Sequence, residues 1–225
     1  MTTPNHLVPA ALAVAFTTVV EGLSLAEFMP APLAYLAGAA WGVAVVAAAR
    51  WIARRPTAAA RTENGLVVLG TVAMGLFAFG GFAGLLLLNG AMDSDSLTGE
   101  TLVAMFLPSI PVAIAGNVPT ELLVVPGLLI LGWRPGVRRI LILAAAGLYL
   151  VIRVWSYLVF VSGRLDFAAA ERSTTPLTAA ERADYVDQLH LNDPRWVLNL
   201  AVFGIFLAAA HVPRFAARKA PAAAG

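Results

Sequence analysis

The sequence predicts an all-α, polytopic integral membrane helical bundle formed by a single transmembrane domain over residues 1–225. Two observations carry this prediction. Only 12% of the 225 residues are charged, whereas 60% are hydrophobic and the mean hydropathy is +0.80. Soluble domains carry about 25% charged residues, twice this density. The apolar residues also fall into runs that approach the 20 or so residues a helix needs to cross a bilayer.

Six apolar runs qualify as transmembrane helices. They cover residues 7–28, 32–53, 65–89, 117–133, 138–163 and 195–213. The stretch 101–116 is also apolar, but Pro108 and Pro111 interrupt it and no charged loop separates it from the next run. We therefore expect a half-helix or re-entrant segment there, which membranes tolerate where protein surrounds the broken backbone. A seventh crossing is the alternative.

The placement of basic residues predicts the orientation. With six crossings, one side of the membrane holds Arg50, Arg54, Arg55, Arg61, Arg134, Arg138, Arg139, Arg214, Arg218 and Lys219. The positive-inside rule then places both termini in the cytoplasm, as expected for a multi-pass protein of a bacterial-type cytoplasmic membrane. Seven crossings would put the 134–139 loop outside. The first apolar run lacks a basic flank and a small-residue cleavage site, so we expect a retained helix rather than a signal peptide.

The segment 164–194 is the one sizeable polar loop, and the six-crossing arrangement makes it extracytoplasmic. Thr178 and Glu181 have the spacing of a capping box, which predicts a short amphipathic helix running to about Leu191. The dipeptide Asp193-Pro194 matches an N-cap followed by proline at the first helical position, which predicts the start of the last crossing.

Two further patterns concern packing. Gly80 and Gly84 lie one small-xxx-small step apart in the third crossing, a spacing that allows two helices to approach closely. Four tryptophans lie mostly near the ends of the predicted crossings and suit interfacial belts. These are Trp41, Trp51, Trp133 and Trp196.

Composition excludes several kinds of chemistry. The chain has no cysteine, which excludes disulfides, thiolate metal sites and cysteine nucleophiles. Lys219 in the tail is the single lysine, so no Schiff base forms inside the membrane. The three histidines are scattered, and no phosphate-binding loop or paired-histidine helix occurs. We expect no metal, no cofactor and no nucleic-acid partner.

Four polar residues share one predicted depth in the bilayer. At about 1.5 Å per residue, Glu21, Glu121, Arg153 and Asn199 lie roughly 18 to 22 Å from the cytoplasmic ends of their helices. A charged side chain at the centre of a membrane helix costs about 2.5 to 3.5 kcal/mol, so we expect these residues to face the bundle interior. A guanidinium binds a carboxylate through two parallel hydrogen bonds, which predicts that Arg153 pairs with Glu21 or Glu121.

Two acids and one base lie at this predicted depth, so one carboxyl group has no cationic partner. This imbalance indicates acid–base chemistry. The acid without a partner keeps its proton because burial disfavours the charged form, and it can act as a general acid. The alternative is that an Arg–Glu pair joins helices and the second glutamate is inert. The predicted catalytic residues are Glu21, Glu121, Arg153 and Tyr157, and the predicted substrate-binding residues are Tyr149, Trp155, Phe160, Asn199 and Asn117.

These features predict a small membrane-embedded enzyme that performs metal-free acid–base chemistry, of cyclisation or isomerisation type, on an apolar isoprenoid, polyketide or lipid-like substrate. The architecture resembles that of compact membrane-bound terpene cyclases, which use carboxylic acids to start cyclisation, although no stretch matches their motifs. A proton-coupled carrier and a non-catalytic membrane subunit are the alternatives. The expected partners are membrane lipids and the apolar substrate, and homo-oligomerisation remains open.

Overall fold

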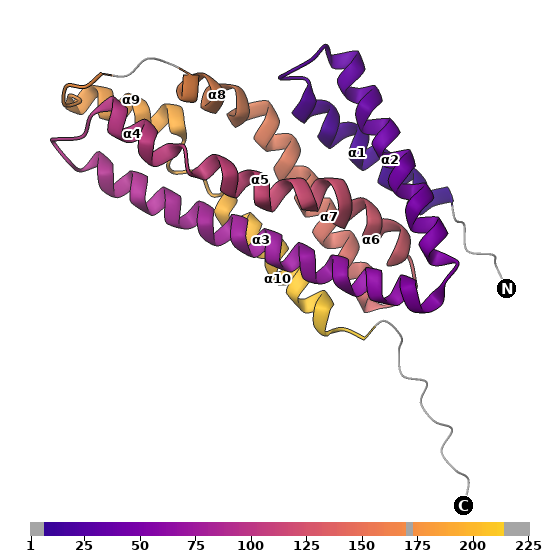
Figure 1. The fold of residues 1–225 in the computed structure, drawn as a ribbon. Helices are drawn as coiled ribbons and strands as arrows, with labels where there is room; N and C mark the ends of the chain where they lie inside the picture. The colour runs from indigo at the N-terminus through magenta and orange to yellow at the C-terminus, as the bar shows by residue number, and fades with distance from the viewer. Residues whose placement is uncertain (1–6, 170–172, 214–225) are drawn as a thin grey trace, which may run out of the picture.

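A computed structural model describes residues 7–169 and 173–213 of the chain (Figure 1). The described residues form helices joined by short turns, with no strand among them, and Thr98 and Pro176 make an isolated backbone bridge. The helices are α1 (Leu7–Leu25), α2 (Ala31–Ala53), α3 (Pro56–Met92), α4 (Gly99–Phe106), α5 (Ser109–Pro119), the π-helix η1 (Thr120–Val124), α6 (Val125–Leu131), α7 (Val137–Ser156), the π-helix η2 (Tyr157–Val161), α8 (Ser162–Ala169), α9 (Ala179–Leu189) and α10 (Arg195–His211).

Five helical segments in this part of the chain are long and apolar enough to cross a membrane, which confirms the predicted membrane helical bundle. They are Leu7–Leu25, Ala31–Ala53, Pro56–Met92, Gly99–Leu131 and Val137–Val161. The last predicted crossing forms α10, a shorter apolar helix of 17 residues.

The prediction of a separate half-helix at 101–116 is wrong. Gly99–Leu131 forms one helical path of 33 residues that runs beside α3, and the turn at Leu107 and Pro108 interrupts it without reversing it (Figure 1). Pro108 and Pro111 are tolerated because they precede or lie in the first turn of α5, where backbone N–H groups have no intrahelical partner. The stretch is therefore the first part of the fourth crossing, and it adds no seventh.

Helices α1 and α2 form a tight hairpin because glycines of α2 face α1. A Cβ atom on Gly38 would lie 2.6 Å from the Thr17 carbonyl oxygen, and one on Gly42 would overlap Thr17 Oγ1. The predicted glycine pair in α3 behaves differently. A Cβ on Gly80 would meet Val112 at 2.7 Å, but one on Gly84 would meet nothing within 4 Å. The small-xxx-small contact is thus made by Gly38 and Gly42.

Three hydrophobic clusters stabilise the described structure, the smallest of which consists of Ala49, Ala59 and Leu131. The largest one joins α1, α3, α6, α7 and α10 and includes Phe16, Met74, Tyr149 and Phe206. The second core, which we call the head, lies at the far end of α3. It consists of Leu88, Met92, Leu97, Leu102, Phe106, Phe167, Leu177, Leu189 and Leu191. With 37 residues, α3 is about 55 Å long and exceeds the roughly 30 Å hydrocarbon core.

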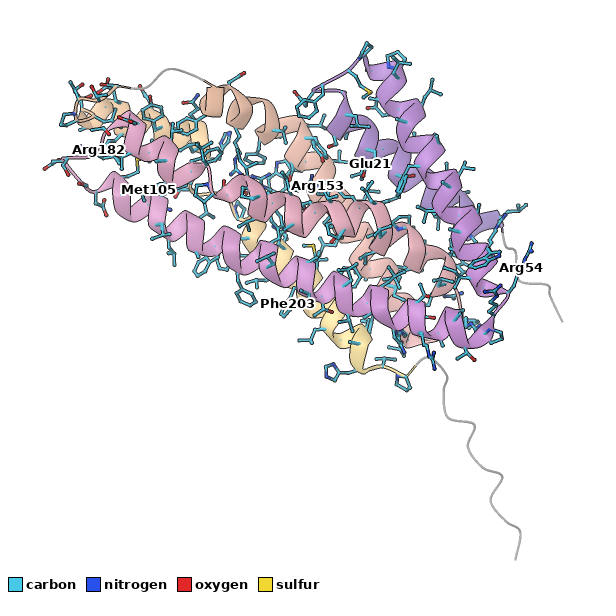
Figure 2. All side chains as sticks on the ribbon, viewed as in Figure 1. Glu21, Arg54, Met105, Arg153, Arg182 and Phe203 are labelled. Carbon is cyan, nitrogen blue, oxygen red and sulfur yellow. The ribbon has the colours of Figure 1, made fainter. Side chains whose placement is uncertain are left out.

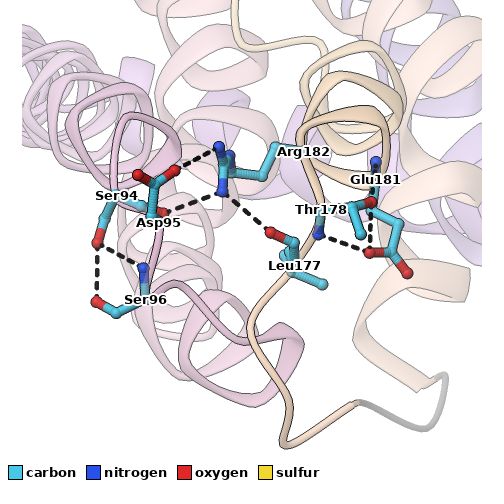
Figure 3. Close-up of polar contacts among 7 residues, drawn as sticks. All are labelled: Ser94, Asp95, Ser96, Leu177, Thr178, Glu181 and Arg182. Carbon is cyan, nitrogen blue, oxygen red and sulfur yellow. Dashed lines mark hydrogen bonds and ion pairs between the residues drawn. The ribbon is translucent and has the colours of Figure 1, made fainter.

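The predicted capping box is present at the start of α9. Thr178 N donates to Glu181 Oε2 over 2.8 Å, and Glu181 N donates to Thr178 Oγ1 over 3.2 Å (Figure 3). Next to it, Arg182 pairs with Asp95 at 3.0 Å and so joins α9 to the loop after α3. The helix ends at Leu189, two residues before the predicted Leu191.

The start of α10 differs from the prediction by one residue. Helix α10 begins at Arg195, with Pro194 before it rather than at its first position. Asp193 still caps the helix, because its Oδ1 accepts a 3.0 Å hydrogen bond from the backbone N–H of Arg195. Proline at the N-cap removes an N–H, and the carboxylate satisfies the next one.

Candidate functional site

The ion pair expected in the membrane interior is present. Arg153 Nε of α7 contacts Glu121 Oε1 of η1, and both side chains are buried. The sequence left Glu21 and Glu121 as equal candidates for this pairing, and the structure selects Glu121. The pair joins the fourth crossing to the fifth.

Two tyrosines complete the surroundings of the pair. The Tyr149 hydroxyl lies 2.9 Å from Glu121 Oε1 and 3.0 Å from Asn117 Oδ1, and the whole side chain is buried. Since a hydroxyl carries one proton, Tyr149 donates to one of these acceptors at a time. On the other side, Arg153 Nη2 donates to the Tyr157 hydroxyl over 2.5 Å. The Arg153 guanidinium carbon also lies 4.5 Å from the centre of the Tyr157 ring.

Both π-helices carry residues of this network. Glu121 is the second residue of η1, which begins directly after Pro119, and Tyr157 is the first residue of η2. Pro119 has no N–H to donate to the preceding turn, and the helix widens into η1 at the next residue. Two side-chain bonds support η1: Thr120 Oγ1 donates to the Gly116 carbonyl over 2.8 Å, and Trp41 Nε1 donates to the Leu122 carbonyl over 2.9 Å. Such π-helical turns occur frequently at functional sites.

Glu21 approaches this network from α1. Its side chain is half-buried, its Oε1 atom is shielded from solvent, and that atom has no hydrogen-bond partner within the described residues. Helix α1 packs against η1 and α7, and Glu21 interacts electrostatically with both Glu121 and Arg153. Figure 2 labels Glu21 on α1 and Arg153 on α7 in the same region of the bundle. The predicted catalytic residues are therefore gathered in one place, with Glu21 outside the ion pair.

A second buried ion pair extends the network toward the head, and no pattern in the sequence indicated it. Arg195 Nε contacts Asp193 Oδ2, and Arg195 Nη1 donates to Ser156 Oγ over 2.8 Å. Both charged residues are buried, although we assigned them to the polar loop and its boundary. The residues were missed because a charge beside a polar loop normally lies in water.

Phe160 is covered rather than open. The Arg195 guanidinium lies 3.4 Å from the centre of the Phe160 ring, the Arg164 guanidinium lies 5.9 Å from it, and the His190 ring meets it edge-on at 4.7 Å. The half-buried Trp155 has its ring centre 6.0 Å away. Phe160, which we predicted to bind substrate together with Trp155, therefore lies against two arginine side chains.

Asn199 of α10 also lies inside the bundle, as its predicted depth required. It is 6% exposed, and its Oδ1 atom has no hydrogen-bond partner among the described residues. It lies one helical turn beyond Arg195.

The number of charged groups in the network differs from the prediction. The sequence placed two acids and one base at the middle of the membrane. The network in the described structure holds three carboxyl groups and three guanidinium groups: Glu21, Glu121 and Asp193 against Arg153, Arg164 and Arg195. Carboxyl groups outnumber guanidinium groups around Arg153, where Glu21 and Glu121 face one base. In the whole network the two kinds of group are equal in number.

The opposite end of the bundle holds a separate polar pocket. Arg138 pairs with Glu63 at 3.2 Å and donates to Asn64 Oδ1 over 2.7 Å, and both charged side chains are buried. An open pocket of about 400 Å³ lies beside them, with His211 in its lining. Arg138 lies at the predicted boundary between a loop and the fifth crossing, and no pattern in the sequence indicates Glu63. No group of three or more metal-ligating side chains occurs within the described ranges.

No family model, curated protein or solved structure matches the chain. The fold and the polar network together define the protein as a multi-pass helical membrane protein with a buried acid–arginine–tyrosine network between its helices.

Proposed function

We propose that the protein is a small membrane-embedded enzyme that performs metal-free acid–base chemistry on an apolar substrate, with Glu21 as the proton donor. One observation carries the proposal: Glu21 Oε1 is shielded and has no hydrogen-bond partner among the described residues, while the neighbouring Glu121 is paired with Arg153. An ionised carboxylate that accepts no hydrogen bonds is costly away from water. We therefore propose that Glu21 is protonated and can transfer its proton to a substrate.

The reaction type is cyclisation or isomerisation, in which protons are added and removed without net consumption. Glu21 donates a proton to a carbon–carbon double bond and leaves a carbocation on the substrate. The Glu121 carboxylate accepts the proton that the cation loses. Glu121 then releases this proton to water and Glu21 takes one up from water, which restores the starting state. Arg153 and Tyr149 hold Glu121 in place. The ring faces of Tyr157 and Trp155 favour the cation.

Isoprenoids, polyketides and other lipid-like molecules are the proposed substrates because they partition into the bilayer that surrounds the helices. The proposed location is a bacterial-type cytoplasmic membrane with both termini in the cytoplasm. The arginine-rich end of the bundle, with Arg54, Arg55, Arg138 and Arg139, supports this orientation through the positive-inside rule. Figure 2 labels Arg54 near this end and Arg182 near the other.

Solvent deuterium tests the proposal for any substrate of this class. The purified protein is incubated in D₂O with apolar lipids extracted from the source membranes, and the products are analysed by mass spectrometry. An isomerase of this kind adds a deuteron and removes a proton, so the product is one mass unit heavier. Glu21→Gln should abolish the incorporation, and Glu27→Gln, a change at an exposed glutamate of the same hairpin, should preserve it. Equal incorporation by both variants, or none with the wild type, contradicts the proposal.

A proton-coupled carrier is the second candidate, because the same carboxyl group that donates to a substrate can also load and release a proton. In proteoliposomes with an internal pH dye, a carrier moves solute and protons together and requires a gradient. An enzyme turns over its substrate without one. A third role, as a non-catalytic membrane subunit, predicts activity only in the presence of a partner protein.

A further inference from the structure

The two arginines beside Phe160 share one carboxylate. Asp193 pairs with Arg195, and its charge also reaches Arg164. Arg195 also interacts electrostatically with Arg164 and with Arg153, and the charge of Arg153 is matched by that of Glu121. The part of the network at Phe160 therefore holds two guanidinium groups and one carboxylate. Arginine keeps its charge even when buried, so this excess positive charge persists.

A hydrogen-bond donor of this part of the network is unused. Arg164 Nε is shielded and has no partner in the described structure, and its Nη2 makes a single long bond of 3.4 Å to the Leu189 carbonyl. Such buried unpaired groups are rare in folded proteins, and each one requires an explanation such as water or an absent ligand.

The surrounding structure holds the two guanidinium groups together despite their repulsion. Ser156 Oγ accepts from Arg195, the Leu189 carbonyl accepts from Arg164, and the Phe160 ring lies against both. His190 follows Leu189 with a φ of 50°, a left-handed conformation that is uncommon for a residue other than glycine. This strained residue ends α9 and places its ring against Phe160. Uncommon backbone conformations of this kind cluster at ligand sites.

We propose that Arg164 and Arg195 bind the anionic head group, a phosphate or carboxylate, of an amphiphilic ligand whose apolar chain extends along the bundle toward Glu21. Guanidinium groups suit both head groups because their parallel N–H donors match two oxygen atoms. The inference rests on the proposed function and specifies its substrate class. Arg164 lies eleven residues after Arg153, about 16 Å along the helix, so the head group is bound well away from the reacting carbon.

A binding experiment separates this inference from the catalytic proposal. The protein is purified in an uncharged maltoside detergent, and its melting temperature is measured against increasing dodecyl phosphate, laurate or dodecanol. We expect at least one of the two anionic compounds to bind about tenfold more tightly than the alcohol of the same length. Preference for dodecyl phosphate identifies a phosphate head group, and preference for laurate identifies a carboxylate.

Variants of Arg164 test whether the preference for an anionic head group arises at the proposed site. Arg164→Gln should remove most of the preference for the anion, and Arg164→Lys should restore part of it. Arg182→Gln is the matched control, because Arg182 belongs to the same end of the molecule but pairs with the exposed Asp95. Equal affinity for all three compounds, or the same loss in the Arg164 and Arg182 variants, overturns the inference. Glu21→Gln should bind the anion normally, so a failure of the catalytic proposal leaves this measurement interpretable.

Discussion

Trp41 Nε1 donates a 2.9 Å hydrogen bond to the carbonyl oxygen of Leu122, and this bond ties α2 to the π-helix η1. The accepting residue directly follows Glu121. Helix α2 therefore helps to position the acid without contacting its carboxyl group. We expected Trp41 in an interfacial belt, but it lies near the middle of the 23-residue α2.

Replacement of Trp41 by phenylalanine should loosen η1. The ring remains apolar, but the Leu122 carbonyl loses its donor, which costs about 1 kcal/mol. We expect faster hydrogen–deuterium exchange across residues 120–124 and a severalfold loss of the deuterium incorporation described above. Trp51→Phe, at an exposed position where the ring contacts Arg55, is the control and should change neither quantity. Unchanged exchange in the Trp41 variant would mean that η1 is stable without this bond.

Removal of the buried cation should damage folding more than neutralisation of its partner. Arg153→Leu leaves Glu121 buried and unpaired, which costs about 3 to 5 kcal/mol of stability. Glu121→Gln keeps a hydrogen-bond acceptor for Tyr149, and Glu21 can ionise to compensate the charge of Arg153, so we expect nearly normal expression. The double variant, Glu121→Gln with Arg153→Leu, should recover part of the loss. Thermal unfolding in detergent measures all three, and a single Arg153→Leu variant as stable as the wild type contradicts the assigned pairing.

The glycines of α2 offer a test of the α1–α2 hairpin. Gly38→Ala should destabilise the protein by about 1 to 3 kcal/mol because the new methyl group meets the Thr17 carbonyl oxygen. Gly84→Ala adds the same group where no atom lies within 4 Å, and alanine favours helices over glycine. We expect that control to melt at the wild-type temperature or slightly above it. Equal losses in the two variants would show that close packing is not the cause.

The capping box predicts a pH dependence confined to α9. The hydrogen bonds from Thr178 hold the pKa of Glu181 below its ordinary value of about 4.3. Because the folded pKa is the lower one, the capping interaction stabilises α9 fully above about pH 4.3 and loses this effect as the pH falls through the folded pKa. Hydrogen exchange at residues 179–182, corrected for the intrinsic pH effect, should report this loss of protection. In Glu181→Gln the protection should not change with pH over this range.

Local and periodic signals accounted for much of the structure. Capping spacing located the start of α9, and depth along each helix was sufficient to bring Glu21, Glu121 and Arg153 together. Features that depend on tertiary contact leave no such local signal. Arg195 and Asp193 adjoin a polar loop and are buried where Arg195 packs against Ser156 of α7 and Phe160 of η2, which no local pattern predicts. For the same reason Gly80 and Gly84 appeared equivalent, although one faces Val112 and the other faces open space.

The length of α3 has a practical consequence. The helix exceeds the hydrocarbon thickness by about 25 Å, and its far end is joined to α4, α8 and α9 through the head. A protein of 23.5 kDa has little ordered mass outside a detergent belt for image alignment in electron cryo-microscopy. An antibody fragment raised against α9 would attach to this protruding, well-packed platform and supply the missing mass while leaving the buried network undisturbed.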